Sequence, residues 1–144
     1  MRKEIITIVF ATIIGSLNVF CQEPNSGNLI ILADNFKTNQ GIAMVKLFRE
    51  SDDVISKPFL QAKALIENGK AQLIISDLPF GEYAAILWHD ENENGILDHS
   101  WGMPAELMGF SNHWKLSILS GMPTFDKLRF VFNKQNPNCE IHVK

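Results

Sequence analysis

The sequence predicts an all-β domain: a single antiparallel β-sandwich of about seven short strands, immunoglobulin-like or transthyretin-like in arrangement. Two observations support this class. Apolar and polar residues alternate over several short stretches, and turn-forming residues such as Asn68–Gly69 separate those stretches. A third observation adds a cover: residues 99–124 are apolar without regular periodicity, so we expect this long segment to lie over one sheet face rather than remain in water.

Two alternating stretches open the domain. The first predicted strand is Asn28–Phe36, in which one face carries Leu29, Ile31 and Ala33. The second is Ile42–Arg49, in which one face carries Ala43, Val45 and Leu47. Side chains alternate across a strand with a period of two, so each of these sets is expected to face the core.

The dipeptide Asn68–Gly69 lies between two apolar runs. Both residues tolerate a positive φ, and such a pair is a strong short-range signal for a β-hairpin. We therefore expect Ala62–Glu67 and Lys70–Ser76 to pair as antiparallel strands.

The stretch Glu82–His89 is apolar on both faces. One face carries Tyr83, Ala85 and Leu87, and the other carries Ala84, Ile86 and Trp88. A strand of this kind is expected to be covered on both sides. The apolar segment 99–124 follows it in the chain and is predicted to supply the second cover near Trp88.

Alternation returns at the end of the chain. In Phe125–Asn133 the predicted core residues are Leu128, Phe130 and Phe132, and in the last stretch they are Cys139, Ile141 and Val143. Both stretches are predicted to be strands.

Residues 1–21 are predicted to be a signal peptide, which leaves residues 22–144 as the sandwich domain. A basic start at Arg2 and Lys3 precedes a short apolar run, the usual order in a secretory signal. Cleavage after Cys21 would make Gln22 the new N-terminus, and the alternative is a lipid anchor on Cys21. Either outcome predicts an exported protein, located in the periplasm or outer envelope and without a transmembrane span in the mature chain.

Charge and cysteine content narrow the function classes. Without residues 1–21 the chain has 11 basic and 15 acidic residues, a net charge of −4. Such an acidic balance argues against nucleic-acid binding, which selects for basic surfaces. Cys139 is then the only cysteine, so the domain is expected to fold without a disulfide.

The loop that follows the doubly apolar strand has the spacing of a calcium-binding loop. Carboxylate or amide oxygens occur at alternate positions, then a glycine, then another carboxylate. Hard oxygens converging on one turn suit Ca²⁺. The predicted ligands are Asp90, Asn92, Asn94, the carbonyl of Ile96, and Asp98.

The twelfth position of this loop departs from a helical calcium hand. Trp101 stands where a bidentate glutamate would be, and a strand rather than a helix precedes the loop, so an EF-hand is excluded. Glu106 or Glu91 could supply the missing carboxylate. The alternative is a polar turn in which Asp and Asn side chains cap their own backbone.

Other chemistry has weaker support. His89 and His99 flank the loop, so a zinc site or a metal-dependent hydrolase using His89, Asp90 and Asp98 is an alternative, but their spacing matches no short zinc motif. No nucleophile elbow or phosphate-binding glycine loop is present in the sequence. No catalytic residue is therefore predicted.

Four aromatic or imidazole residues in the apolar segment could form a platform for a sugar or a peptide. They are Trp101, Phe110, His113 and Trp114. The competing interpretation is burial over the second face of the Glu82–His89 strand, which stabilises a protein by roughly 1.5–3 kcal/mol per large side chain.

Three motifs together resemble a known family. They are Leu78-Pro79-x-Gly81-x-Tyr83, His89-Asp90-x-Asn92-x-Asn94-Gly95, and Gly102-x-Pro104 followed by Gly109-Phe110-Ser111-Asn112, with Pro123-x-Phe125-Asp126 further on. The chain thus resembles bacterial domain-of-unknown-function family 2141 from Leu29 to Val143. The resemblance implies an exported β-sandwich and no assigned function. Phe80 replaces a usual proline, and Met108 replaces an aromatic residue that is common in the family.

The expected function is that of a non-enzymatic exported module, either a binding module or a structural component of the envelope, with a weak calcium site at residues 90–98. The partner is not predicted. The alternatives are the aromatic platform and the metal-dependent hydrolase described above.

Overall fold

The computed structural model describes residues 25–54, 57–117 and 119–144. The predicted signal peptide and the two expected fates of Cys21 lie outside the described residues. In the described part of the chain, no helix is both long enough and apolar enough to span a bilayer.

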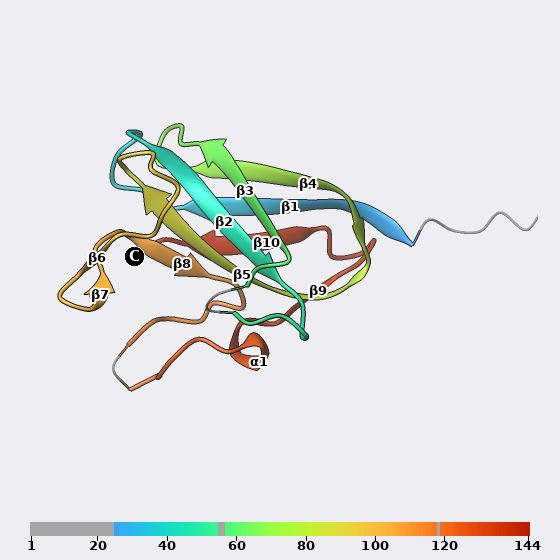
Figure 1. The fold of residues 1–144 in the computed structure, drawn as a ribbon. Helices are drawn as coiled ribbons and strands as arrows, with labels where there is room; N and C mark the ends of the chain where they lie inside the picture. Colours follow the sequence, from blue (N-terminus) through green and yellow to red (C-terminus); the bar gives the residue numbers. More distant parts are fainter. Residues whose placement is uncertain (1–24, 55–56, 118) are drawn as a thin grey trace, which may run out of the picture.

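Two sheets pack face to face as a sandwich, which confirms the predicted fold class (Figure 1). The three-stranded sheet has the order β10-β1-β4, formed by Asn138–His142, Ser26–Asp34 and Ala71–Pro79. The five-stranded sheet has the order β3-β2-β5-β8, with β9 also paired to β5. Its strands are Leu60–Leu65, Ile42–Phe48, Gly81–Asp90, Met108–Phe110 and Phe130–Phe132. A separate small hairpin consists of β6 (His99–Ser100) and β7 (Met103–Pro104).

The main core lies between the two sheets. The predicted inward residues of β1 and β2 are all buried there, as are those of β10. These residues are Leu29, Ile31, Ala33, Ala43, Val45, Leu47, Cys139 and Ile141. The strand alternation in the sequence therefore placed the inner faces correctly.

The central strand β5 is buried on both faces, as its composition predicted. Tyr83, Ala85 and Leu87 belong to the main core. Ala84 and Ile86 contact a second cluster with Phe110, Phe125 and Leu128 on the outer side of the sheet. Trp88 packs in a third cluster with Ile42 and Met44.

One strand pair differs from the expected antiparallel pattern. β10 pairs with β1 in parallel, and the register aligns Ile31 with Cys139 and Asp34 with His142. A parallel pair needs a long crossover connection, and here nearly the whole domain intervenes between the two strands. Every other strand pair that joins the described strands is antiparallel.

The predicted hairpin at Asn68–Gly69 is wrong in its pairing, although the turn is present. Both residues have positive φ, and an isolated bridge joins Glu67 to Lys70. Beyond that bridge the strands separate: β3 pairs with β2, and β4 pairs with β1. The turn thus connects the two sheets, because apolar residues on both arms face the shared core.

The predicted strand Phe125–Asn133 is also partly wrong. Its first four residues form the short helix α1 (Phe125–Leu128), and only Phe130–Phe132 is a strand. In the helix Phe125 and Leu128 are three residues apart and both buried against β5. This spacing places them on one helical face.

The segment 99–124 covers the outer face of β5 only in part. Phe110 is buried, and Met108 and Trp114 pack against the second cluster. Other apolar residues of the same segment are exposed: Trp101, Met103, Leu116, Leu119 and Met122. Among the described residues of the segment, the cover is thus formed by Met108, Phe110 and Trp114, and Met108 also packs against the cluster that contains Trp88, as expected.

A close approach of backbones holds β8 in place. A Cβ at Gly109 would lie 2.5 Å from Ile141 Cγ2 and 3.1 Å from His142 O. Ser111, fully buried, accepts the Ala85 N–H at 2.8 Å and lies 2.5 Å from Leu128 O. Glycine and serine in the Gly-Phe-Ser-Asn motif are thus required by packing.

Gly109→Ala is expected to lower the free energy of unfolding by about 1–3 kcal/mol, the usual cost of overpacking. The added methyl group would collide with buried Ile141. Gly81→Ala is the matched control, because the nearest atom to its Cβ is 3.8 Å away. Urea denaturation of both variants measures the difference, and equal stability of the two would contradict the packing argument.

Candidate functional site

Asp90, the last residue of β5, organises the loop that follows. Its side chain is fully buried. Oδ1 accepts the N–H of Asn94 at 3.1 Å, and Oδ2 accepts the N–H of Gly95 at 2.7 Å. Gly95 has a positive φ, which lets the backbone turn sharply towards the carboxylate. Asp90 therefore fixes the turn from its inner side.

Asn92, Asn94 and Asp98 converge on the outer side of the turn. The amide nitrogens of Asn92 and Asn94 donate to Asp98 Oδ2 at 2.7 and 3.2 Å. Their amide oxygens accept backbone N–H groups two residues further on, at 3.0 Å for Asn94 N and 2.7 Å for Ile96 N. These are the capping bonds of a polar turn, which was the alternative interpretation of this loop.

Glu106 approaches the same loop from the segment before β8. Its Oε2 accepts the N–H of Asp98 at 3.2 Å, and the Asp98 carbonyl accepts the N–H of Ala105 at 2.8 Å. Its Oε1 is buried and has no hydrogen-bond partner. Of the two residues expected to supply a further carboxylate, Glu106 is thus joined to the loop, whereas the Glu91 side chain is more than half exposed.

The pKa of Glu106 is raised above its usual value of 4.5, chiefly because burial disfavours the charged form. Hydrogen bonding from the backbone of Asp98, and to a smaller extent from that of Glu91, opposes this shift, whereas the negative charges of Asp90 and Asp98 add to it. Two neighbouring carboxylates therefore contribute to the raised pKa of Glu106.

The donor set suits a hard cation, but the described geometry is that of a closed turn. Among residues 25–54, 57–117 and 119–144, no three His, Cys, Asp or Glu side chains are arranged to hold a metal ion. Coordination by Asn92 and Asn94 would require their amides to rotate, so that oxygens replace the nitrogens that now contact Asp98.

The residues of the hydrolase and zinc alternatives differ in their exposure to solvent. His89 is fully buried, with Nε2 at 2.7 Å from the carbonyl of Gln40 and its ring edge-on to Phe36. Its Nδ1 lies 3.6 Å from Glu91 Oε1. His99 is exposed on β6. A substrate would therefore find neither His89 nor Asp90 at the surface.

The predicted aromatic platform divides into two parts. Phe110 and Trp114 are edge-on with ring centroids 4.8 Å apart, and the exposed His113 stacks on His142 at 6.0 Å. The three predicted residues Phe110, His113 and Trp114 line one cavity of about 440 Å³. Trp101 is not among its lining residues and lies fully exposed in the turn between β6 and β7.

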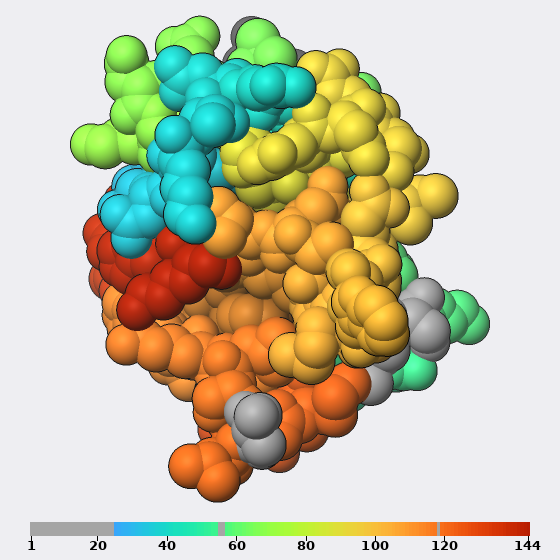
Figure 2. All heavy atoms as spheres, turned by 90° about the vertical axis from the view of Figure 1, so that its left-hand side faces the viewer, coloured from blue at the N-terminus to red at the C-terminus, as the bar shows by residue number. Residues whose placement is uncertain are grey.

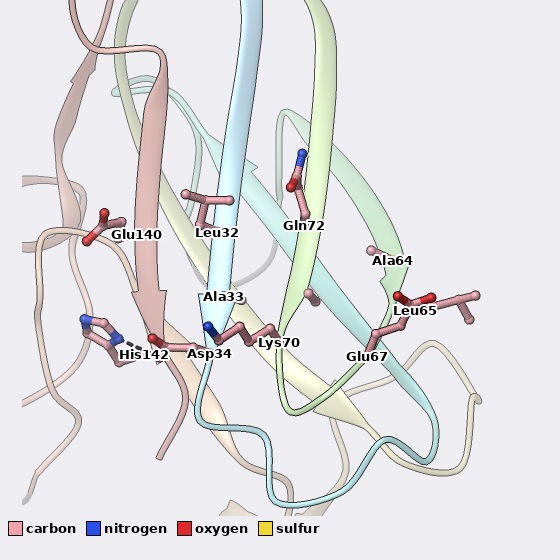
Figure 3. A pocket seen from close by; sticks show the side chains of 11 residues that line it. Leu32, Ala33, Asp34, Ala64, Leu65, Glu67, Lys70, Gln72, Glu140 and His142 are labelled. Atoms are coloured by element: carbon pink, nitrogen blue, oxygen red, sulfur yellow. Dashed lines mark hydrogen bonds and ion pairs between the residues drawn. The ribbon is translucent and has the colours of Figure 1, made fainter.

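Five lining residues of this cavity were not predicted as site residues from the sequence: Asp34, Asn35, Lys115, His142 and Lys144. His142 Nδ1 lies 2.6 Å from Asp34 Oδ1, because the parallel register of β10 and β1 aligns the two residues. Figure 3 shows this pair among the residues that line a larger concavity of about 720 Å³, formed by β1, β4 and β10 together with β3 and the turn between β3 and β4. No residue predicted as a site lines that concavity.

The exposure of the tryptophans predicts a fluorescence result. Trp88 is buried and Trp114 is partly buried, whereas Trp101 is fully exposed. Iodide is expected to quench one fraction of the emission, and Trp101→Phe should remove that fraction and shift the remaining emission to shorter wavelength. An accessible fraction of unchanged size in the variant would contradict the exposed position.

Glu106→Gln is expected to change how stability depends on pH. A carboxyl whose pKa is raised in the fold stabilises the protein fully below its unfolded value, and this contribution is lost as pH rises through the folded value. Glutamine does not ionise, so the wild type should lose stability relative to the variant as pH rises above the usual glutamate pKa of 4.5. Denaturation in a chelator measures the difference, with Glu93→Gln as a loop control. A pH-independent difference would contradict the burial effect.

The comparisons with known proteins agree with the motifs. No curated protein and no solved structure matches this chain. One family model matches residues 31–140, which is most of the sandwich and includes the loop, β8 and the cavity residues Asp34, His113 and Trp114. The chain therefore belongs to the bacterial family described as "Uncharacterized protein conserved in bacteria (DUF2141)".

Proposed function

We propose that this protein is an exported, non-enzymatic binding or envelope-structural module whose Asp90–Asp98 loop binds calcium. Export, to the periplasm or outer envelope, is inferred from the signal-like residues 1–21. The fate of Cys21, removal or lipidation, distinguishes a free from an anchored form.

The position of Glu106 is the observation that supports calcium best. Its Oε1 is buried without a partner, while Oε2 holds the backbone of Asp98. A buried carboxylate oxygen without a partner is costly, and a bound cation would satisfy it. The same cation would also reduce the repulsion from Asp90 and Asp98, which adds to the effect of burial in raising the Glu106 pKa.

The proposed ligand set consists of the five ligands predicted from the loop spacing and one further carboxylate. Asp90, Asn92, Asn94, the carbonyl of Ile96 and Asp98 supply the loop oxygens, and Glu106 supplies the carboxylate that is missing at the twelfth position. Because the Asn amides must first exchange their bonds to Asp98, affinity is expected to be weak, about 10⁻⁴–10⁻³ M, as in extracellular calcium modules.

The ion would have a structural role. Asp98 precedes the β6–β7 hairpin and Glu106 follows it, so a cation bound by both would hold the two ends of the hairpin together. The burial of His89 and Asp90 favours this structural role over hydrolysis at the same loop.

Calcium at about 10 mM is expected to raise the melting temperature by several degrees. Ligand at about 10 to 100 times the dissociation constant stabilises a fold by roughly 1.4–2.7 kcal/mol. A chelator should reverse the shift. Magnesium should produce a smaller shift, because it tolerates irregular coordination poorly.

Two variants locate the ion. Asp98→Asn and Glu106→Gln should each abolish most of the calcium-induced shift. Glu93→Gln is the matched control: it removes one negative charge from an exposed position of the same loop and should leave the shift intact. If calcium does not change the wild-type melting temperature, or if all three variants respond equally, the proposed site is wrong.

A further inference from the structure

Three adjoining cavities extend from the outer face of β5 to the edge of the sandwich where β8 meets β10, beside the segment that follows the loop. We call them the apolar cavity (about 430 Å³, floored by Ile86 and Trp88), the bridging cavity (about 200 Å³, beside Met108), and the basic cavity (about 440 Å³, beside His142). Figure 2 faces this side and shows a hollow between the C-terminal strand, in red, and the segment after the loop, in orange.

Shared walls show that the cavities follow one another. Met108 and Leu116 line both the apolar and the bridging cavity. Trp114 and Lys115 line both the bridging and the basic cavity. Phe110 lines all three. A single elongated ligand can therefore occupy the series.

The apolar cavity is lined mainly by apolar side chains, which suits a hydrocarbon chain. Its floor is the buried outer face of β5, and its opposite wall includes Leu97 and Met103. Lys46 and His99 are its only lining residues that can carry a charge. Lys46 Nζ lies 5.2 Å from the centroid of the Trp88 ring, so the ammonium is held at the wall by the indole.

The charged side chains that line the basic cavity at the other end are mainly basic. Lys115, Lys144, His113 and His142 line it, and its one carboxylate, Asp34, is already paired with His142. Lys144 is held beside β8 because its N–H donates to Met108 O at 2.9 Å and its carbonyl accepts Met108 N–H at 3.2 Å. The backbone of Lys144 is thus held beside β8, and the exposed Lys115 and Lys144 line the same cavity.

The two lysines disturb each other. Hydrogen bonding with Lys115, together with repulsion from its charge, lowers the pKa of Lys144. An anion between the two amines would relieve that repulsion. Glu106 lines the bridging cavity together with Lys115 and Lys144, but it does not line the basic cavity. The position for an anionic head is therefore on the side of the two lysines that faces the basic cavity.

We propose that these cavities bind a single-chain aliphatic carboxylate, a fatty acid. Its carboxylate contacts Lys115 and Lys144, its first methylene groups cross Phe110 and Trp114, and its chain enters the apolar cavity over Ile86 and Trp88. The apolar cavity and the basic cavity each have a volume in the range usual for small-molecule sites, about 300–1,000 Å³. This assignment goes beyond calcium binding and does not depend on it.

The test is calorimetric titration of the protein, free of the signal peptide, with dodecanoate below its micelle concentration and with a chelator present to prevent calcium soaps. Saturable binding of one molecule per chain is expected, with a matching change in Trp88 and Trp114 fluorescence. Butanoate should bind far more weakly, because it cannot fill the apolar cavity. Dodecyltrimethylammonium should not bind, because its charge matches that of the lysines.

Paired variants test both ends. Lys115→Gln combined with Lys144→Gln should weaken dodecanoate binding by about tenfold or more, the scale of a lost charge-assisted hydrogen bond. The control is Lys63→Gln combined with Lys70→Gln, which removes two exposed lysines elsewhere. Leu116→Asp should weaken binding at the apolar wall, whereas Leu119→Asp, at a fully exposed position outside the cavities, should not.

Several results would overturn the proposal. They are absence of saturable dodecanoate binding, equal affinity for butanoate, equal affinity for the neutral dodecanol, or equal effects of the two lysine pairs. Binding of maltose without binding of dodecanoate would instead assign the aromatic wall to a sugar. Circular dichroism of each variant confirms that a lost affinity does not reflect a lost fold.

Discussion

The structure depends on the burial of β5 on both faces. Its inner face completes the sandwich core, but its outer face presents Ala84, Ile86 and Trp88, which cannot remain in water without large cost. The chain must therefore reverse directly after Asp90 and return across the sheet. The polar loop performs this reversal, and β8, Trp114 and α1 form the cover. Loop, cavities and cover all follow from that one constraint.

The cover is incomplete, and its gaps form the cavities. Phe110 and Leu128 pack closely against Ala84 and Ile86, where the side chains beneath are small or branched. Near Trp88 the chain stands further off, carried outwards by the β6–β7 hairpin, and the apolar cavity remains between hairpin and sheet. Several apolar side chains of the segment are exposed as a result, so an apolar ligand would gain contacts that the protein alone does not make.

The sequence predicted local features well and non-local pairings poorly. Alternation identified the inward faces of β1, β2, β5 and β10, because a period of two is visible within a single strand. Asn68–Gly69 specified a turn, but which strands its arms would join depends on distant partners. Leu128, which is buried, and Phe130, which is half-buried, suited an alternating strand as well as the positions that they occupy around the end of α1. Periodicity over so few residues therefore did not distinguish helix from strand.

The same division applies to the sites. The loop from Asp90 to Asp98 is contiguous, so its oxygens could be identified from spacing alone, and Glu106 could be named because it follows closely. The basic cavity could not be predicted as a unit. It combines Asp34 with residues 113–115 and with His142 and Lys144, and they meet because β10 pairs in parallel with β1 and then contacts β8. An expected antiparallel sheet gave no reason to place Lys115 beside Lys144.

The two proposed sites share one stretch of chain, and this makes them thermodynamically linked. Ile96 and Leu97 belong to the loop and also line the apolar cavity, and Glu106 contacts the loop while lining the bridging cavity. A cation that fixes Asp98 against Glu106 would fix the cavity wall at the same time. Whatever factor calcium then contributes to fatty-acid affinity, the fatty acid must contribute to calcium affinity, because coupling between two sites is reciprocal. We expect this coupling to be favourable. An ion that orders residues 96–106 would reduce the conformational entropy that these residues lose when they enclose an aliphatic chain against Trp88.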